Sequence, residues 1–201
     1  MAVVEGVAMN DGRVEVGEAG SGGALLAPRE AAYTAVFGAG ALLLPVLFHA
    51  MQLGRWFLPM YLPLFALAFL VRPAAAAATA AAVPWISALL TGMPPFYPPV
   101  ALWMSVELGV TVGTAAWLAH RRAGARPLPI LLCCLIGGRF LHVGLVWATA
   151  RLMDLPAGLL AGLSLFSGWP GVLLICLVVP PVVRQLRGAG SSTYAPPARG
   201  R

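Results

Sequence analysis

Residues 99–119 read PVALWMSVELGVTVGTAAWLA, a continuous apolar run in which Glu107 is the only charged side chain. A run of about 20 apolar residues is long enough to cross the hydrocarbon core of a bilayer as a helix. Polar and apolar residues do not alternate along it, so the run is typical of a lipid-facing helix and not of a strand in an outer-membrane barrel. This stretch therefore indicates an integral membrane protein.

Five further apolar runs flank this one, at Ala31–Phe48, Trp56–Val71, Ala74–Leu90, Leu128–Thr149 and Ala157–Val183. The chain of 201 residues is 60% hydrophobic and only 10% charged. A small soluble domain has too much surface for its volume to hide so much apolar area, so the excess must face lipid. We predict an all-α integral membrane protein with six transmembrane helices. The second and third runs are joined only through Arg72 and Pro73, so they form either a tight hairpin or a partly re-entrant pair.

The composition divides the chain into three parts. Residues 1–28 are rich in Gly, Glu and Ala without periodicity, which predicts a disordered cytoplasmic tail. Residues 29–187 form the six-helix membrane domain, and residues 188–201 form a flexible cytoplasmic tail. No extramembrane catalytic domain fits in the remaining length.

The basic residues predict the topology. All 13 are arginines, and without a lysine the chain cannot form a Walker A nucleotide-binding loop. With both termini in the cytoplasm, the outer loops contain only Arg55 and Arg151, while the cytoplasmic side holds Arg29, Arg72, Arg121, Arg122, Arg126, Arg184 and Arg187. Cytoplasmic loops are enriched in basic residues, so we predict that both termini are cytoplasmic.

Two ionisable side chains lie deep inside predicted spans, Glu107 and Arg139. At 1.5 Å per residue they lie about 12 Å and about 15 Å from the outer ends of their helices, so antiparallel packing would bring them together. His142 is one turn outward from Arg139 on the same face, and Trp103 is one turn outward from Glu107. Intramembrane charges usually serve a function, which favours a ligand site; the alternative is a buried ion pair that only fixes helix packing.

The outer half of the predicted bundle supplies further candidates for substrate binding. Trp85 and Tyr97, with Phe96, offer flat apolar walls, while His49 and Arg55 in the first outer loop are either ligand contacts or interfacial anchors. Arg139, His142 and Arg55 give this side surplus positive charge, so we expect a small carboxylate-bearing or heterocyclic micronutrient.

Other chemistry has weaker support. The three cysteines lie in apolar stretches without a C-x-x-C spacing, so we predict neither a metal site nor a cofactor. Ser164 lies among glycines, as in intramembrane serine hydrolases, but all three histidines precede it and no base is evident. Ala31, Ala35 and Ala39 recur every fourth residue, a pattern that lets another helix approach closely.

Several segments together resemble the substrate-binding S components of energy-coupling factor (ECF) transporters. The resemblance covers about residues 40–183, and residues 90–95, LTGMPP, are its most specific part. Tyr61 stands where relatives typically have histidine, and Ile175 where they have glutamine. The matching segments are LPMYLP at 58–63, PWISALLTGMPP at 84–95, Glu107-Leu108, Gly138-Arg139 and Pro170-Gly171.

This resemblance implies a six-helix uptake subunit without an enzymatic activity of its own. Such proteins capture a vitamin or related micronutrient with their outer loops and last three helices. They dock on a transmembrane coupling (T) subunit that is driven by two cytoplasmic ATPases, in the plasma membrane of a prokaryote. The resemblance also implies that the alanine stripe of residues 31–39 faces the coupling subunit. Two other classes stay open: an intramembrane serine hydrolase and a non-transporting membrane scaffold.

Overall fold

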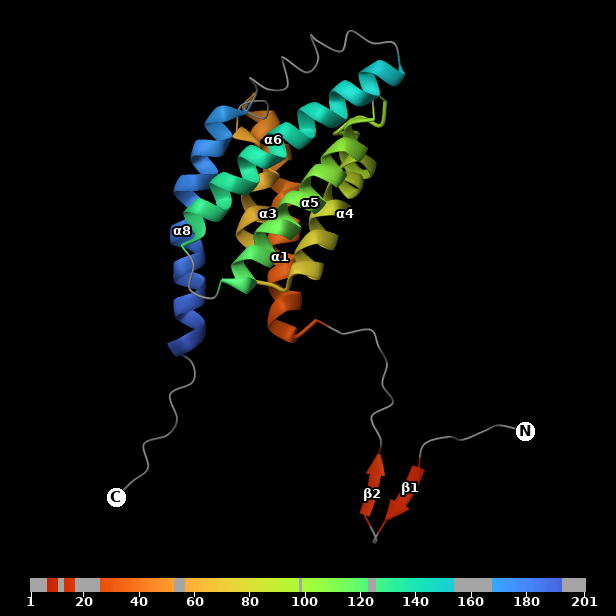
Figure 1. Cartoon of the computed structure of the whole chain (residues 1–201), viewed down its shortest axis with the longest axis vertical. Coiled ribbons are helices and arrows are strands. Elements are labelled where there is room, and N and C mark those ends of the chain that lie inside the picture. The colour runs from red at the N-terminus through yellow and green to blue at the C-terminus, as the bar shows by residue number, and fades with distance from the viewer. Residues whose placement is uncertain are drawn as a thin grey trace, which may run out of the picture.

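The computed structural model describes residues 7–10, 13–16, 26–52, 57–97, 99–122, 126–153 and 168–192. From residue 26 onward these residues form a bundle of helices (Figure 1). The helices are α1 (Pro28–Ala50), α3 (Tyr61–Leu67), α4 (Pro73–Thr91), α5 (Val100–Arg121), α6 (Pro127–Leu152) and α8 (Trp169–Ser192).

Helix boundaries follow local sequence chemistry. Helices α1, α4 and α6 each begin with proline, at Pro28, Pro73 and Pro127. Proline suits the first helical position because its fixed φ is already helical and its missing N–H has no partner there anyway. Helix α4 ends at Thr91 and is followed by Gly92, whose φ of 72° is left-handed, as is common after a helix C-terminus.

Five of the described helices are long and apolar enough to cross a membrane: α1, α4, α5, α6 and α8. The predicted helical membrane protein is thus confirmed in this coarser form. The described part of residues 56–71, predicted as the second span, contributes the seven-residue helix α3, which is about 10 Å long. The described part of the final run, 157–183, is helical only from Trp169.

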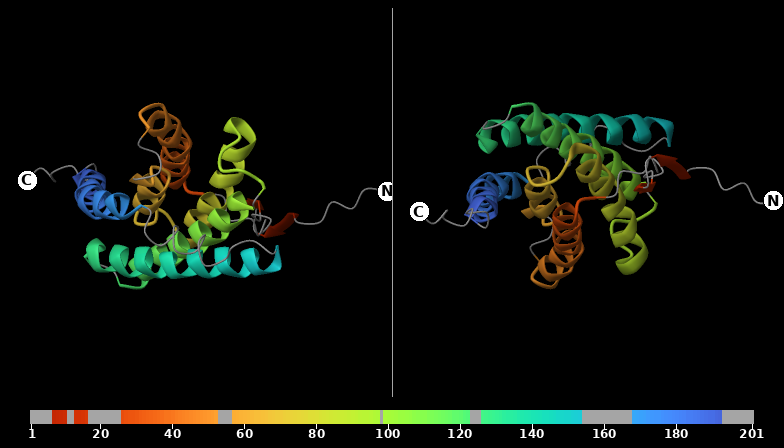
Figure 2. Two further views of the ribbon diagram at one scale, coloured as in Figure 1. Left: turned by 90° about the horizontal axis from the view of Figure 1, so that it is seen from above. Right: turned by 90° about the horizontal axis from the view of Figure 1, so that it is seen from below.

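Helix α3 lies inside the bundle and not at its surface. Figure 2 shows it between α1 and α8, and it also contacts α4 and α5. Its side chains from Pro63 to Leu67 are buried. Non-spanning backbone at membrane depth is tolerated where protein surrounds it, which explains why this apolar run need not cross the bilayer as a helix.

Helices α4 and α5 pack closely through small residues. A Cβ placed on Gly113 would lie 2.9 Å from the Cβ of Ala77, and one on Gly109 would lie 3.2 Å from the Cβ of Ala81. Lipid tails give helices no hydrophobic reason to associate, so close backbone approach supplies the van der Waals contact instead. The alanine-rich start of α4 therefore serves packing within the chain.

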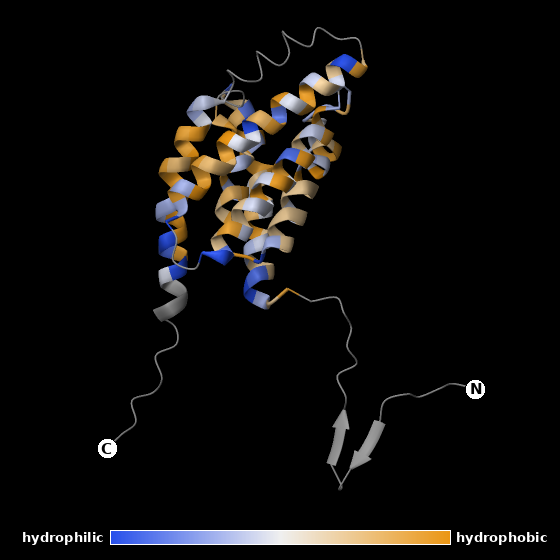
Figure 3. Ribbon diagram, in the orientation of Figure 1, coloured by the Kyte–Doolittle hydropathy of each residue, from blue (hydrophilic) through white to orange (hydrophobic). Residues whose placement is uncertain are grey.

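Charge and hydropathy divide the bundle along its axis. Figure 3 shows apolar residues through the middle and hydrophilic residues at the ends. We call the end where α1 begins and α8 ends the arginine-rich end, because Arg29, Arg72, Arg121, Arg122, Arg126, Arg184 and Arg187 belong to it. Within the described residues, the opposite, arginine-poor end holds Arg151, and the predicted outer residue Arg55 lies outside them.

Both tails contain described secondary structure. Residues Val7–Asn10 (β1) and Arg13–Val16 (β2) pair as antiparallel strands within the segment for which we predicted disorder. Valines at 7, 14 and 16 favour strands, and the intervening Asp-Gly dipeptide is typical of tight hairpins, a local signal that the average composition hides. At the other terminus α8 continues to Ser192, five residues beyond the predicted domain end at 187.

Candidate functional site

A pocket of about 370 Å³ opens at the arginine-poor end of the bundle. We call it the methionine pocket, because Met60, Met93 and Met104 reach it from three separate segments. Thioether side chains are polarisable and adapt to irregular ligands. The other lining residues are Pro45, Val46, His49, Leu58, Pro59, Tyr61, Ser87, Thr91 and Pro94.

Hydrogen bonds hold the loop that forms one wall of this pocket. The buried Ser87 hydroxyl donates to the Met93 carbonyl at 2.7 Å. The Thr91 hydroxyl donates to the Ser87 carbonyl at 2.8 Å and accepts from the Met93 N–H at 3.3 Å. Two side chains of α4 therefore fix the position of Met93 and Pro94 above the end of their own helix.

Replacing Ser87 with alanine should lower the free energy of unfolding by about 1 kcal/mol, because the Met93 carbonyl loses its shorter hydrogen bond. Thr114→Ala is a matched control, since that exposed hydroxyl bonds only the Val110 carbonyl of its own helix. Thermal unfolding in detergent measures both variants. Equal midpoints for the two would contradict the assigned role of Ser87.

His49 is the member of the predicted first outer loop that the structure places at this pocket. Its Nδ1 lies 3.2 Å from the Pro45 carbonyl and donates to it. In the neutral ring this leaves Nε2 as an acceptor. One predicted binding residue is therefore part of the pocket, and Arg55, predicted beside it, lies outside the described residues.

A second, smaller cavity lies deeper and has no room for a water molecule. We call it the polar cavity, because Tyr61, Glu107, Thr111 and Arg139 line it together with Leu58, Phe65, Cys134, Leu135 and Gly138. The structure thus brings Glu107 and Arg139 together, as the helix positions suggested.

The partner of Glu107, however, is His142 and not Arg139. The Glu107 carboxylate is 1% exposed, and its Oε2 lies 2.7 Å from His142 Nδ1. The described residues contain no carboxylate within ion-pairing distance of Arg139. Gly138 makes the contact of α5 with α6 possible, since a Cβ there would lie 2.9 Å from Thr111 Cγ2 and 3.5 Å from Glu107 Oε1.

The predicted aromatic residues lie outside both cavities. The Trp103 indole donates to Thr149 at 2.9 Å, and the Trp85 indole donates to Ser105 at 2.9 Å while its ring contacts Phe96. Tyr97 is 76% exposed. These tryptophans therefore tie helices together, and they do not line the described pocket.

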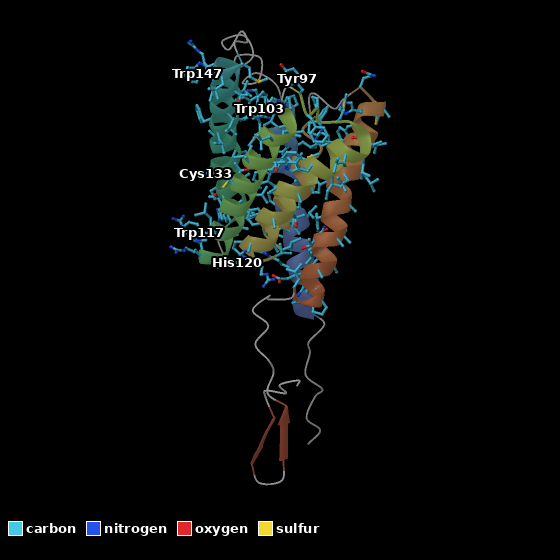
Figure 4. The ribbon with its side chains drawn as sticks, turned by 90° about the vertical axis from the view of Figure 1, so that its right-hand side faces the viewer. Tyr97, Trp103, Trp117, His120, Cys133 and Trp147 are labelled. Carbon is cyan, nitrogen blue, oxygen red and sulfur yellow. The ribbon has the colours of Figure 1, made fainter. Side chains whose placement is uncertain are left out.

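Aromatic residues mark both ends of the bundle. Figure 4 shows Tyr97, Trp103 and Trp147 toward one end and Trp117 and His120 toward the other. Arg121 stacks on the Trp117 ring at 4.2 Å, and Arg151 lies over the Trp147 ring at 5.3 Å. Rings of this kind at the two ends are typical of membrane–water interfaces.

The remaining predicted residues are placed as follows. Ala31, Ala35 and Ala39 are exposed on α1, which is the least buried of the five long helices. Ser164, the candidate nucleophile, lies outside the described residues. Among the described residues, no group of three or more His, Cys, Asp or Glu side chains is arranged to hold a metal ion.

Sequence reasoning missed the methionines, Ser87 and Leu58 as parts of a site. The methionines come from unrelated positions in three segments, so no spacing could have linked them. Comparison of the chain with models of known protein families, with curated proteins and with solved structures found no match.

Proposed function

We propose that this protein is the substrate-capture subunit of an ECF-type importer for a vitamin or related micronutrient, powered by separate ATPase partners. The observation that carries the proposal is the methionine pocket at the arginine-poor end. With the arginine-rich end in the cytoplasm, this pocket faces the side from which a nutrient arrives. Its volume and its apolar wall with a few hydroxyl and imidazole groups are typical of small-molecule sites.

Two further features support capture without chemistry. Lysine is absent from the whole chain, so energy from a Walker A ATPase has to come from another subunit. Among the described residues, the lining of the pocket includes one histidine and no carboxylate, so these residues do not assemble a nucleophile with a base and an orienting group. We place the protein in the plasma membrane of a prokaryote, with both termini in the cytoplasm.

The experiment is purification of the full chain from its native membrane in mild detergent. Co-purifying ATPase subunits and a transmembrane coupling subunit would support the proposal, and mass spectrometry of the small molecules released on denaturation would name the substrate. Ester or peptide hydrolysis by the isolated chain would favour a serine hydrolase that uses Ser164. If the chain co-purifies with no partner subunits and shows no hydrolysis, the result would favour a membrane scaffold.

The exposed face of α1 is the proposed contact with the coupling subunit. Replacing Ala35 with phenylalanine should abolish co-purification of the ATPase subunits, because the bulky ring prevents close approach of a partner helix. The variant should still fold, since Ala35 is exposed. Intact assembly in Ala35→Phe would contradict this contact.

Val36→Phe is the control for that variant, because Val36 is 68% exposed and already bulky and lies beside the alanine stripe. It should leave assembly intact. Equal loss of assembly in both variants would indicate general damage to α1.

A further inference from the structure

The methionine pocket and the polar cavity are neighbours that share two lining residues, Leu58 and Tyr61. Tyr61 lies within electrostatic reach of both Glu107 and Arg139, so it belongs to the polar side of this boundary. Leu58 has no polar atom in its side chain and separates the pocket from the charged groups. What lies behind Leu58 therefore decides whether the site ends at the pocket.

Behind Leu58 is an arginine with an unused donor. Arg139 is 9% exposed, and its Nη2 has no hydrogen-bond partner among the described residues. Buried polar groups are almost always paired, and an unpaired donor on a charged group is especially unfavourable. No oxygen of the Glu107 carboxylate lies within hydrogen-bonding or ion-pairing distance of this nitrogen, so Glu107 does not supply the missing acceptor.

The unused donor lies against the N-terminus of α8. The Gly168 carbonyl accepts the first hydrogen bond of this helix, from the N–H of Val172. A Cβ placed on Gly168 would lie only 2.5 Å from Arg139 Nη2. A helix N-terminus carries about half a positive charge, so two positive groups meet here, and no carboxylate of the described residues pairs with the arginine.

The separating residue has an unfavourable backbone conformation. Leu58 has a φ of 47°, in the left-handed region that bulky residues rarely adopt. Its side chain is held against α8, where a Cβ on Gly168 would lie 2.9 Å from Leu58 Cδ1. Such conformations persist only where the surroundings impose them, and they concentrate at ligand clamps and switches.

We propose that the two cavities form one binding site for an amphipathic monocarboxylate, with Leu58 as a movable partition. The apolar body occupies the methionine pocket, and the carboxylate reaches Arg139 Nη2 and the N-terminus of α8. One guanidinium that lacks a carboxylate partner, with the partial charge of the helix, balances about one negative charge and favours a monoanion over a doubly charged phosphate. This inference rests on the proposed function, since it takes the methionine pocket as the capture site.

The test compares three probes with one apolar body: phenylpentanoate, its neutral amide phenylpentanamide and the cationic phenylpentylamine. Binding to the full chain in detergent is followed by tryptophan fluorescence and by thermal unfolding. The carboxylate should bind at least about tenfold more tightly than the amide, and the amine should bind weakest. Equal affinity of the unmodified protein for the carboxylate and the amide would by itself overturn the proposal.

Arg139→Gln should reduce the affinity for the carboxylate to that for the amide. Arg151→Gln is the matched control, because Arg151 is at the same end but stacks on Trp147 outside the site. Arg151→Gln should keep the preference for the carboxylate over the amide, and an equal loss of this preference in both variants would overturn the role of Arg139.

Leu58→Gly accepts the positive φ and removes the partition, so it should speed association of the carboxylate at least about tenfold. An unchanged association rate would overturn the role of Leu58.

The measurements distinguish a failure of this inference from a failure of the proposed importer. A preference for the carboxylate that depends on Arg139, without co-purifying ATPase subunits, would keep the site and reject the importer. ATPase partners together with equal binding of the carboxylate and the amide would keep the importer and reject the monocarboxylate site.

Discussion

Replacing Glu107 with alanine should lower the free energy of unfolding by about 3–5 kcal/mol, the largest effect we expect from a single side chain here. The carboxylate is the charged partner of His142, and it lies in the same small cavity as the buried Arg139. Without it, the arginine charge keeps its desolvation penalty and loses its nearest compensating charge. Unfolding in mixed micelles measures this decrease in the free energy of unfolding.

Glu30→Ala is the control, because this partly exposed carboxylate pairs with Arg72 at the arginine-rich end. Glu30→Ala should lower the free energy of unfolding by about 1 kcal/mol or less, since exposed ion pairs contribute little. A double-mutant cycle between Glu107→Gln and His142→Gln should give a coupling energy of about 0.5–3 kcal/mol. A stability of Glu107→Ala within about 1 kcal/mol of the parent would refute the role of this pair.

Replacing Gly171 with alanine should destabilise the protein by about 1–3 kcal/mol, because the new methyl group has no room. A Cβ there would lie 2.6 Å from both the carbonyl carbon and the carbonyl oxygen of Phe57, which are backbone atoms and cannot rotate away. The start of α8 would have to move off the segment that leads into α3. Thermal unfolding and binding of phenylpentanoate should both be impaired.

Gly144→Ala is the matched substitution, since a Cβ at Gly144 on α6 meets nothing within 4 Å. This variant should match the parent or gain about 0.5–1 kcal/mol from the better helix propensity of alanine. If Gly144→Ala lost stability and Gly171→Ala did not, the packing that we assign to these two glycines would be contradicted.

The sequence predicts the long helices well because lipid demands continuous apolar runs and proline marks their first turns. The sequence predicts spans at residues 74–90 and 99–119; α4 covers the first, and α5 covers the second from Val100 onward. Whether residues 56–71 form a spanning helix could not be predicted from the sequence in the same way. An apolar residue can face lipid or protein, so apolarity alone does not distinguish a spanning helix from the buried helix α3.

The candidate site was also predictable from the sequence only in part. Spacing places Glu107, Arg139 and His142 on facing helices at one depth, and the structure brings Glu107 and His142 into contact. Which of the two basic residues bonds the carboxylate depends on the rotation of α6 about its axis, and Gly138 allows the close approach of α6 to α5 there. The methionine pocket is assembled from helix and loop residues that lie far apart in the sequence, and no local pattern connects them.

The short helix α3 also determines the order in which the protein can be completed. It lies between α1, which is made early, and α8, which is made last. Chains are synthesised from the N-terminus, so α3 must wait for most of the protein to leave the ribosome before its full environment exists. Until then its exposed backbone ends lie in lipid or against the insertion machinery. Nascent chains that stop before α8 should therefore be held by that machinery or degraded, and release into the bilayer would coincide with the arrival of the last helix.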